Sequence, residues 1–224
     1  MIAIGLDGFS KGWVAVTLDG DRRSIDFPCD ISWLATQRFD RAAIDIPLGM
    51  NDDGRRACDQ LARAKLRPHA SRVFGGARRW LWQEFSDPDQ ANAHAKERGQ
   101  TKVSRQLWHL GPKIMQVDAF VREHPSLDIR ETHPELVFLR LNADMPLRSK
   151  HEPEGLSRRI ELLQEHGFGE LDTWLTRSRI GHGAKRDDVL DACAASLAAR
   201  DISTAVPAGT PLRDSRGVPM QIWF

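Results

Sequence analysis

Aspartate occupies two positions in this sequence where a charged side chain is unusual. Asp7 ends an apolar first segment, and Asp45 stands inside the apolar run 42–47. β-Strands disfavour aspartate, and a carboxylate at the end of a central strand must face a cleft, pair with a cation or bind a metal, because burying an unpaired charge is costly. The two residues therefore predict a polar site at the edge of a β-sheet.

A second group of carboxylates lies in an Ala-rich segment near the C-terminus. Asp188 and Asp191 are three positions apart, so they are neighbours on one side of a helix predicted over residues 185–200. Strand alternation places Asp7 on the same face as Gly5. Small residues on both elements allow the helix to pack closely on the sheet, and this packing would bring four carboxylates together.

Carboxylates held at close range repel one another and need a cation to stay ionised. Ligands that are all oxygen favour hard ions, so the cluster predicts Mg²⁺ or Mn²⁺ held by Asp7, Asp45, Asp188 and Asp191. Two such ions about 3.5–4 Å apart activate water and stabilise the leaving oxygen in phosphodiester hydrolysis. In the alternative interpretation, the helix acids only favour the helix N-terminus and the strand acids pair with arginines.

Three further residues are candidates for the same site. Glu131 follows a late strand and would supply another ligand or a general base, with His133 alongside it. The alternative is a strand-end acid and an exposed histidine before a proline. Lys150 precedes a helix predicted over 157–166 and would bind a phosphate, although an exposed loop lysine explains it equally well.

Positive charge is concentrated in residues 55–79, which contain eight Lys or Arg and a single acid, Asp59. Phosphate backbones attract such patches through counterion release, so Arg55, Arg56 and Arg63 are predicted to position phosphates. The alternative is a solvated helix face. The segment indicates a nucleic acid or nucleotide as partner.

Composition places the chain among ordinary globular proteins. It has 224 residues, 41% of them hydrophobic and 28% charged, with a formal net charge of +1. The three cysteines form no CxxC pair, which excludes a disulfide framework or zinc ribbon and favours the cytoplasm. No charge-free stretch approaches the roughly 18 residues of a membrane span, so no membrane contact is expected.

Apolar periodicity predicts an α/β fold in a single domain over residues 1–224. The mixed sheet is flanked by helices, and a helical insertion over about 50–125 follows the fourth strand. Strands are expected over 2–7, 13–18, 24–27, 41–46 and 127–131, and helices over 31–37, 55–66, 79–85, 117–123, 157–166 and 185–200.

This arrangement of acids resembles the ribonuclease H-like superfamily, especially its resolvase branch. There a first-strand Asp, a fourth-strand acid and a last-helix Asp-x-x-Asp-Ala assemble the metal site, and Asp7, Asp45 and the pair Asp188 and Asp191 match those places. More closely, the chain is similar to the bacterial family called domain of unknown function 429, described as predicted ribonuclease H-like nucleases. The matching stretches are GLDGFSKGWVAV, AIDIPLGM, RRACDQLAR, PKIMQVD, ETHPELVF, SKHEPEGLSRRIELL and DDVLDACAA.

The resemblance implies a metal-dependent nuclease that hydrolyses phosphodiester bonds. One departure is that a standard ribonuclease H usually has its second acid as a Glu at a helix start, whereas Asp45 lies on the strand. Two other functions stay open: a nucleotide-binding phosphotransferase of the actin-like ATPase type, using the loop Gly8–Gly12, and an inactive ribonuclease H-like scaffold. The sequence also leaves a homo-oligomer open.

Overall fold

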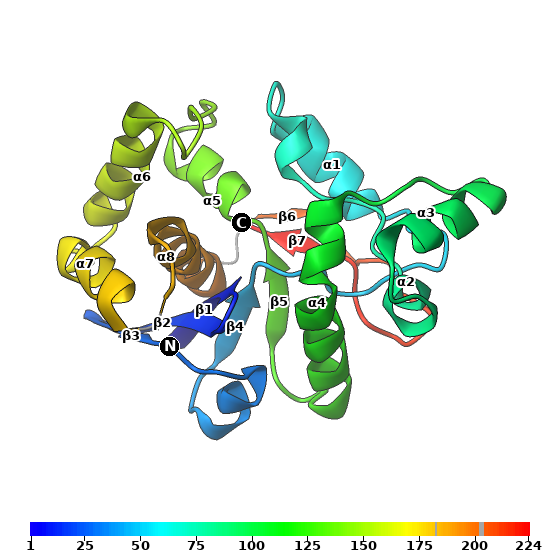
Figure 1. Cartoon of the computed structure of the whole chain (residues 1–224). Coiled ribbons are helices and arrows are strands. Elements are labelled where there is room, and N and C mark those ends of the chain that lie inside the picture. Colours follow the sequence, from blue (N-terminus) through cyan, green and yellow to red (C-terminus); the bar gives the residue numbers. More distant parts are fainter. Residues whose placement is uncertain (182, 202–203) are drawn as a thin grey trace.

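A computed structural model describes residues 1–181, 183–201 and 204–224, with the side chains of 177–181 excepted. These residues form one mixed sheet of seven strands (Figure 1). The strands are β1 (Ile2–Phe9), β2 (Gly12–Asp19), β3 (Arg22–Asp26), β4 (Arg41–Ile44), β5 (Ile129–Thr132), β6 (Ala205–Val206) and β7 (Ile222–Trp223). They lie in the order β3-β2-β1-β4-β5-β7-β6, and the central strands β1, β4, β5 and β7 run parallel.

The first two strands form a long antiparallel hairpin. They pair from Ile2 opposite Asp19 to Phe9 opposite Gly12, and β3 continues antiparallel to β2 across a turn at Gly20, whose φ is +56°. Glycine adopts this left-handed conformation without steric cost. The Gly8–Gly12 loop is thus a turn between two strands, which agrees with the strands expected over 2–7 and 13–18.

Helices cover both faces of the sheet (Figure 1). On one face, α8 packs centrally and is flanked by α1, α5, α6 and α7; on the other lie α2, α3, α4 and the 3-10 helix η1. Their bounds are η1 Ile31–Thr36, α1 Ala57–Lys65, α2 Arg79–Glu84, α3 Pro88–Glu97, α4 Arg105–Glu123, α5 Pro134–Leu141, α6 Pro153–Glu165, α7 Leu171–Gly181 and α8 Arg186–Arg200, with a short 3-10 helix η2 at Ala70–Arg72. The α/β fold with a helix-flanked mixed sheet is therefore as predicted.

The close packing expected between the Ala-rich helix and the first strand is present. A Cβ atom built on Gly5 would lie 2.0 Å from the Ser196 backbone nitrogen and 2.3 Å from the Ala192 carbonyl oxygen. The α8 backbone therefore rests directly on the β1 backbone. Only glycine permits this approach, because any side chain at residue 5 would occupy the space of the helix.

Several elements differ from the sequence-based expectations, and prolines explain three of the differences. Pro88 and Pro134 stand in the first turns of α3 and α5, which were not predicted, and Pro112 lies inside α4, of which only 117–123 was expected. Proline in a first turn is compatible with a helix because the N–H there is unpaired anyway, but the same residue indicates a break in a sequence pattern. The helix α7 and the short strands β6 and β7 were also not predicted, and the short helix expected over 31–37 is a 3-10 helix. The strand expected over 41–46 ends at Ile44, so Asp45 follows β4 instead of lying on it.

The contact at Gly5 generates a stability prediction. Gly5→Ala should lower the free energy of unfolding by about 3 kcal/mol or more, because the added methyl group overlaps backbone atoms that cannot move independently. Urea denaturation followed by circular dichroism measures the change. Gly169→Ala is the matched control, since nothing lies within 4 Å of a Cβ there. Equal stability of the two variants would contradict the packing.

Candidate functional site

A cleft of about 1010 Å³ opens where the first and fourth strands end. Its floor includes Asp7 and Asp45, one wall carries the start of α8, and the opposite wall comes from residues 71–74 and 106–116 of the segment between β4 and β5. This volume is at the upper end for a small-molecule pocket. The cleft therefore has room for an extended ligand at the edge of the sheet.

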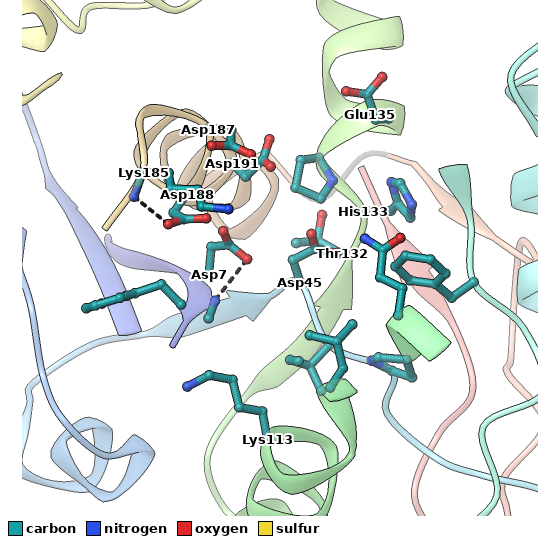
Figure 2. A pocket seen from close by; sticks show the side chains of 18 of the residues that line it. Asp7, Asp45, Lys113, Thr132, His133, Glu135, Lys185, Asp187, Asp188 and Asp191 are labelled. Carbon is teal, nitrogen blue, oxygen red and sulfur yellow. Dashed lines mark hydrogen bonds between the residues drawn. The ribbon is translucent and has the colours of Figure 1, made fainter. Parts of the chain in front are cut away.

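Strand register brings the first two acids together. Strands β1 and β4 are parallel, with Leu6 opposite Ile44, so Asp7 and Asp45 follow at the same end of adjacent strands. The first turns of α8 supply Asp188 and Asp191 above them (Figure 2). The four acids that the sequence singled out thus line one cleft, with Asp7 only 9% and Asp191 6% exposed.

Burial and mutual repulsion make these carboxylates weak acids in the structure. Burial, and after it the neighbouring carboxylates, raises the pKa of Asp7 well above its ordinary value. Burial raises the pKa of Asp45 to about 6, although the nearby His133 opposes the shift. Burial also raises the pKa of Asp188 to about 6. A cation among these groups would relieve the repulsion and favour the ionised forms.

The carboxylate oxygens differ in their partners. Oδ1 of Asp7 accepts a hydrogen bond from the Gly8 backbone N–H at 2.9 Å, and Oδ2 of Asp188 accepts one from the Lys185 N–H at 2.6 Å. Oδ1 of Asp191 is buried and has no hydrogen-bond partner among the described residues. A buried oxygen without a protein partner is costly, and this one is available to bind a cation.

The four aspartates offer the type of ligand that a hard divalent ion prefers, because every donor atom is a carboxylate oxygen. One of these oxygens, Oδ1 of Asp191, is buried and has no partner among the described residues. No three His, Cys, Asp or Glu side chains within the described residues are arranged to hold a metal. An ion would therefore have to draw the carboxylates together against their mutual repulsion. The metal site expected from the sequence stays a prediction.

Basic side chains line the same cleft, and Lys113 of α4 is one that sequence reasoning missed (Figure 2). Its Nζ donates to the Gly12 carbonyl oxygen at 2.8 Å and lies 4.3 Å from the Trp13 ring centroid. The side chain crosses Gly8, where a Cβ atom would lie 2.7 Å from the lysine Cδ. Nothing in the local sequence marks Lys113, because only packing of α4 on the hairpin brings it there.

Glu131 also lines the cleft, but its carboxylate is bound to groups other than the four aspartates. It is level with Ile44 in the sheet, so strand alternation puts it on the opposite side from Asp45. Its Oε2 accepts a hydrogen bond from the Leu48 N–H at 2.8 Å and forms an ion pair with the wholly buried Arg56. Burial raises the pKa of Glu131 to about 8, and Arg56 opposes the shift. The Glu131 carboxylate thus connects the end of β5 to Arg56, the residue before α1.

Most of the basic segment is used in internal contacts. Arg63 donates to the Val73 carbonyl oxygen through Nε at 3.0 Å and Nη2 at 2.9 Å, and Arg79 pairs with Asp118 and Asp214. Arg55 is exposed, but none of the predicted phosphate-binding arginines, Arg55, Arg56 and Arg63, is among the described residues that line the cleft. Arg72 and His133 do line it, and His133 Nε2 lies 3.2 Å from the Arg72 carbonyl oxygen.

Comparison with known proteins identifies one family. A family described as "Protein of unknown function (DUF429)" matches residues 5–211. No curated protein matches, and no solved structure matches, so the finer ribonuclease H-like assignment stays a prediction. No helix within the described part of the chain is long and apolar enough to cross a membrane.

The raised pKa of Asp45 predicts a pH-dependent effect on stability. The pKa of Asp45 is about 6 in the folded protein and near 3.8 in the unfolded chain, so the folded protein binds the Asp45 proton more tightly. Ionisation of Asp45 therefore lowers the free energy of unfolding. This loss is complete above about pH 6 and absent below about pH 4. Without added metal, Asp45→Asn should therefore raise the free energy of unfolding by about 1–3 kcal/mol at pH 8 and leave it unchanged at pH 4. Urea titrations at both pH values measure this.

Asp26→Asn, at an exposed acid of β3, is the control and should change little at either pH. An Asp45→Asn variant that is less stable than the wild type at pH 8 would show that the carboxylate contributes a stabilising contact instead.

Proposed function

The chain belongs to the DUF429 family, and we propose that it is a metal-dependent nuclease that hydrolyses phosphodiester bonds in nucleic acid. The observation that carries the proposal is the convergence of Asp7, Asp45, Asp188 and Asp191 in one open cleft, with the buried Oδ1 of Asp191 unpartnered among the described residues. Acids gathered in this way cost stability, and a cation that offsets this cost also supplies chemistry.

Asp7, Asp45 and Asp191 would hold Mg²⁺ or Mn²⁺, with Asp188 at the edge of the site. Such an ion supplies charge neutralisation at the phosphate and lowers the pKa of bound water. Overall, water adds to phosphorus and one phosphorus–oxygen bond breaks, which leaves a phosphate monoester and a hydroxyl group. Glu131 is bound to Arg56 and serves to position the strand end rather than to hold the ion.

The cleft also carries groups suited to a polyanion. Lys11, Lys113, Lys185 and Arg72 line it together with the acids. Cations around a carboxylate cluster would draw phosphates towards it and fix their position without reading the base sequence. The phosphate-binding role that the sequence assigned to Arg55, Arg56 and Arg63 is thus proposed instead for Arg72, in the same segment, and for lysines that come from other parts of the chain.

The proposal predicts Mn²⁺-dependent cleavage that needs Asp7. Labelled single-stranded and duplex oligonucleotides of DNA and RNA are incubated with the protein and Mn²⁺, and products are separated on a denaturing gel. Asp7→Asn should lower the cleavage rate at least about 100-fold, because the ion loses a ligand, while circular dichroism shows an intact fold. Asp26→Asn is the control and should cleave at the wild-type rate.

A folded Asp7→Asn protein that cleaves at the wild-type rate would refute the role of this carboxylate. If the wild type cleaves none of these substrates, the nuclease proposal fails. Saturable ATP binding in that case would favour the phosphotransferase alternative.

A further inference from the structure

The side chain of Lys150 occupies the acid cluster itself. Its Nζ lies 2.6 Å from Oδ2 of Asp191 and 3.5 Å from Oδ2 of Asp187, and the side chain is 29% exposed. The ammonium group therefore binds one oxygen of Asp191, while Oδ1 of the same carboxylate is the buried oxygen without a partner among the described residues. The two oxygens of Asp191 thus have different environments, one neutralised by a cation and one not.

Several contacts hold the backbone around Lys150, and these contacts fix the position from which its side chain extends. The Leu147 carbonyl oxygen accepts from Nη1 and Nη2 of Arg72, both at 3.3 Å, and the Arg148 carbonyl oxygen accepts from Nη1 of Arg159 at 3.0 Å. A Cβ atom at Gly155 would lie 2.2 Å from the Ser149 carbonyl oxygen. We name residues 147–150 the lysine strap.

The half-buried Glu135 fixes the two arginines that hold the strap. Both oxygens of Glu135 lie 2.8 Å from Nη2 of Arg159, whose side chain is wholly buried, and Glu135 also pairs with Arg72. Glu135 stands in the first turn of α5, directly after β5. The position of the Lys150 backbone is therefore tied to the sheet through two ion pairs that share one carboxylate.

We propose that the ammonium group of Lys150 takes the place of a second metal ion, so that the cluster holds a single divalent cation. The inference rests on the proposed function and specifies its site. Two ions about 3.5–4 Å apart are close enough for one carboxylate to offer an oxygen to each. Asp191 could offer its two oxygens in this way, but Lys150 already holds Oδ2 and leaves only Oδ1 without a partner among the described residues. The single ion is held by Oδ1 of Asp191 together with Asp7 and Asp45.

The other lysines of the cleft, Lys11, Lys113 and Lys185, do not duplicate this role. Lys185 donates its backbone N–H to Asp188, and its side chain forms no ion pair with an acid among the described residues. Lys113 Nζ is bound to the Gly12 carbonyl oxygen, on the side of the hairpin. Lys11 lines the cleft but is exposed and forms no ion pair with an acid among the described residues. Lys150 is therefore the cation that acts on Asp191, and Lys11 provides a matched control of the same residue type in the same cleft.

The test is the stoichiometry of Mn²⁺ binding, which needs no substrate. Mn²⁺ is titrated calorimetrically into the metal-free full chain of the wild type, Lys150→Met, Lys150→Arg and Lys11→Met. The wild type, Lys150→Arg and Lys11→Met should each bind one equivalent. Lys150→Met should bind two, because Oδ2 of Asp191 and Asp187 become free for a second ion. Electron paramagnetic resonance should show a spin-coupled Mn²⁺ pair in Lys150→Met alone.

Two equivalents in the wild type would overturn the inference, because Lys150 would then be displaced by metal. A folded Lys150→Met protein that binds as the wild type does would also overturn it. If Lys150→Met does not fold, Lys150→Gln replaces it. Absence of binding in every variant would reject this inference and the metal of the proposed function together. The expected stoichiometries without any cleavage would instead reject the nuclease alone.

Discussion

The backbone contact between α8 and β1 at Gly5 is the interaction on which the candidate site depends. It lets the helix lie on the central strand with no side chain between them. Since Asp7 is two residues further along β1, and Asp191 precedes the contacting Ala192 by one residue, the same contact sets how close their carboxylates come. A wider helix-to-strand distance would separate the acids and give water access to each of them. The charge density of the cleft is thus a consequence of backbone packing.

That packing has an electrostatic cost, and the structure offsets it locally. Burial disfavours ionisation of Asp7, Asp45 and Asp191, and Lys150 supplies one positive charge. Elsewhere, buried carboxylates are paired with arginines, as Glu131 is with Arg56. The two kinds of acid therefore differ. The acids paired with arginines join elements of the fold, whereas the aspartates of the cleft outnumber the cations that neutralise them. Shared, incompletely neutralised acids at an open cleft are a common feature of functional sites.

The arginine pairs also explain how distant segments reach the cleft. Arg79 of α2 joins Asp118 of α4 to Asp214 near the C-terminus, so the segment between β4 and β5 is fastened to the end of the chain. Arg72 and Arg159 share Glu135 and hold the lysine strap. Removing one partner of such a buried pair leaves an uncompensated charge, so each pair constrains where its two segments lie. One wall of the cleft and the position of Lys150 both depend on these constraints.

The sequence by itself determined the acids and the elements that carry them, because strand alternation and helical spacing are local properties of the chain. Asp7, Asp45, Asp188 and Asp191 could be chosen, and close helix packing expected at Gly5, without coordinates. Only the tertiary structure decided the rest. Glu131 differs from Asp45 by one position in the sheet register, which a sequence pattern does not show. The composition of residues 55–79 indicates an exposed basic surface, although Arg56 and Arg79 are buried. The place of Lys150 depends on contacts between residues 41 and 75 positions apart in the chain, and no local signal encodes such long-range contacts.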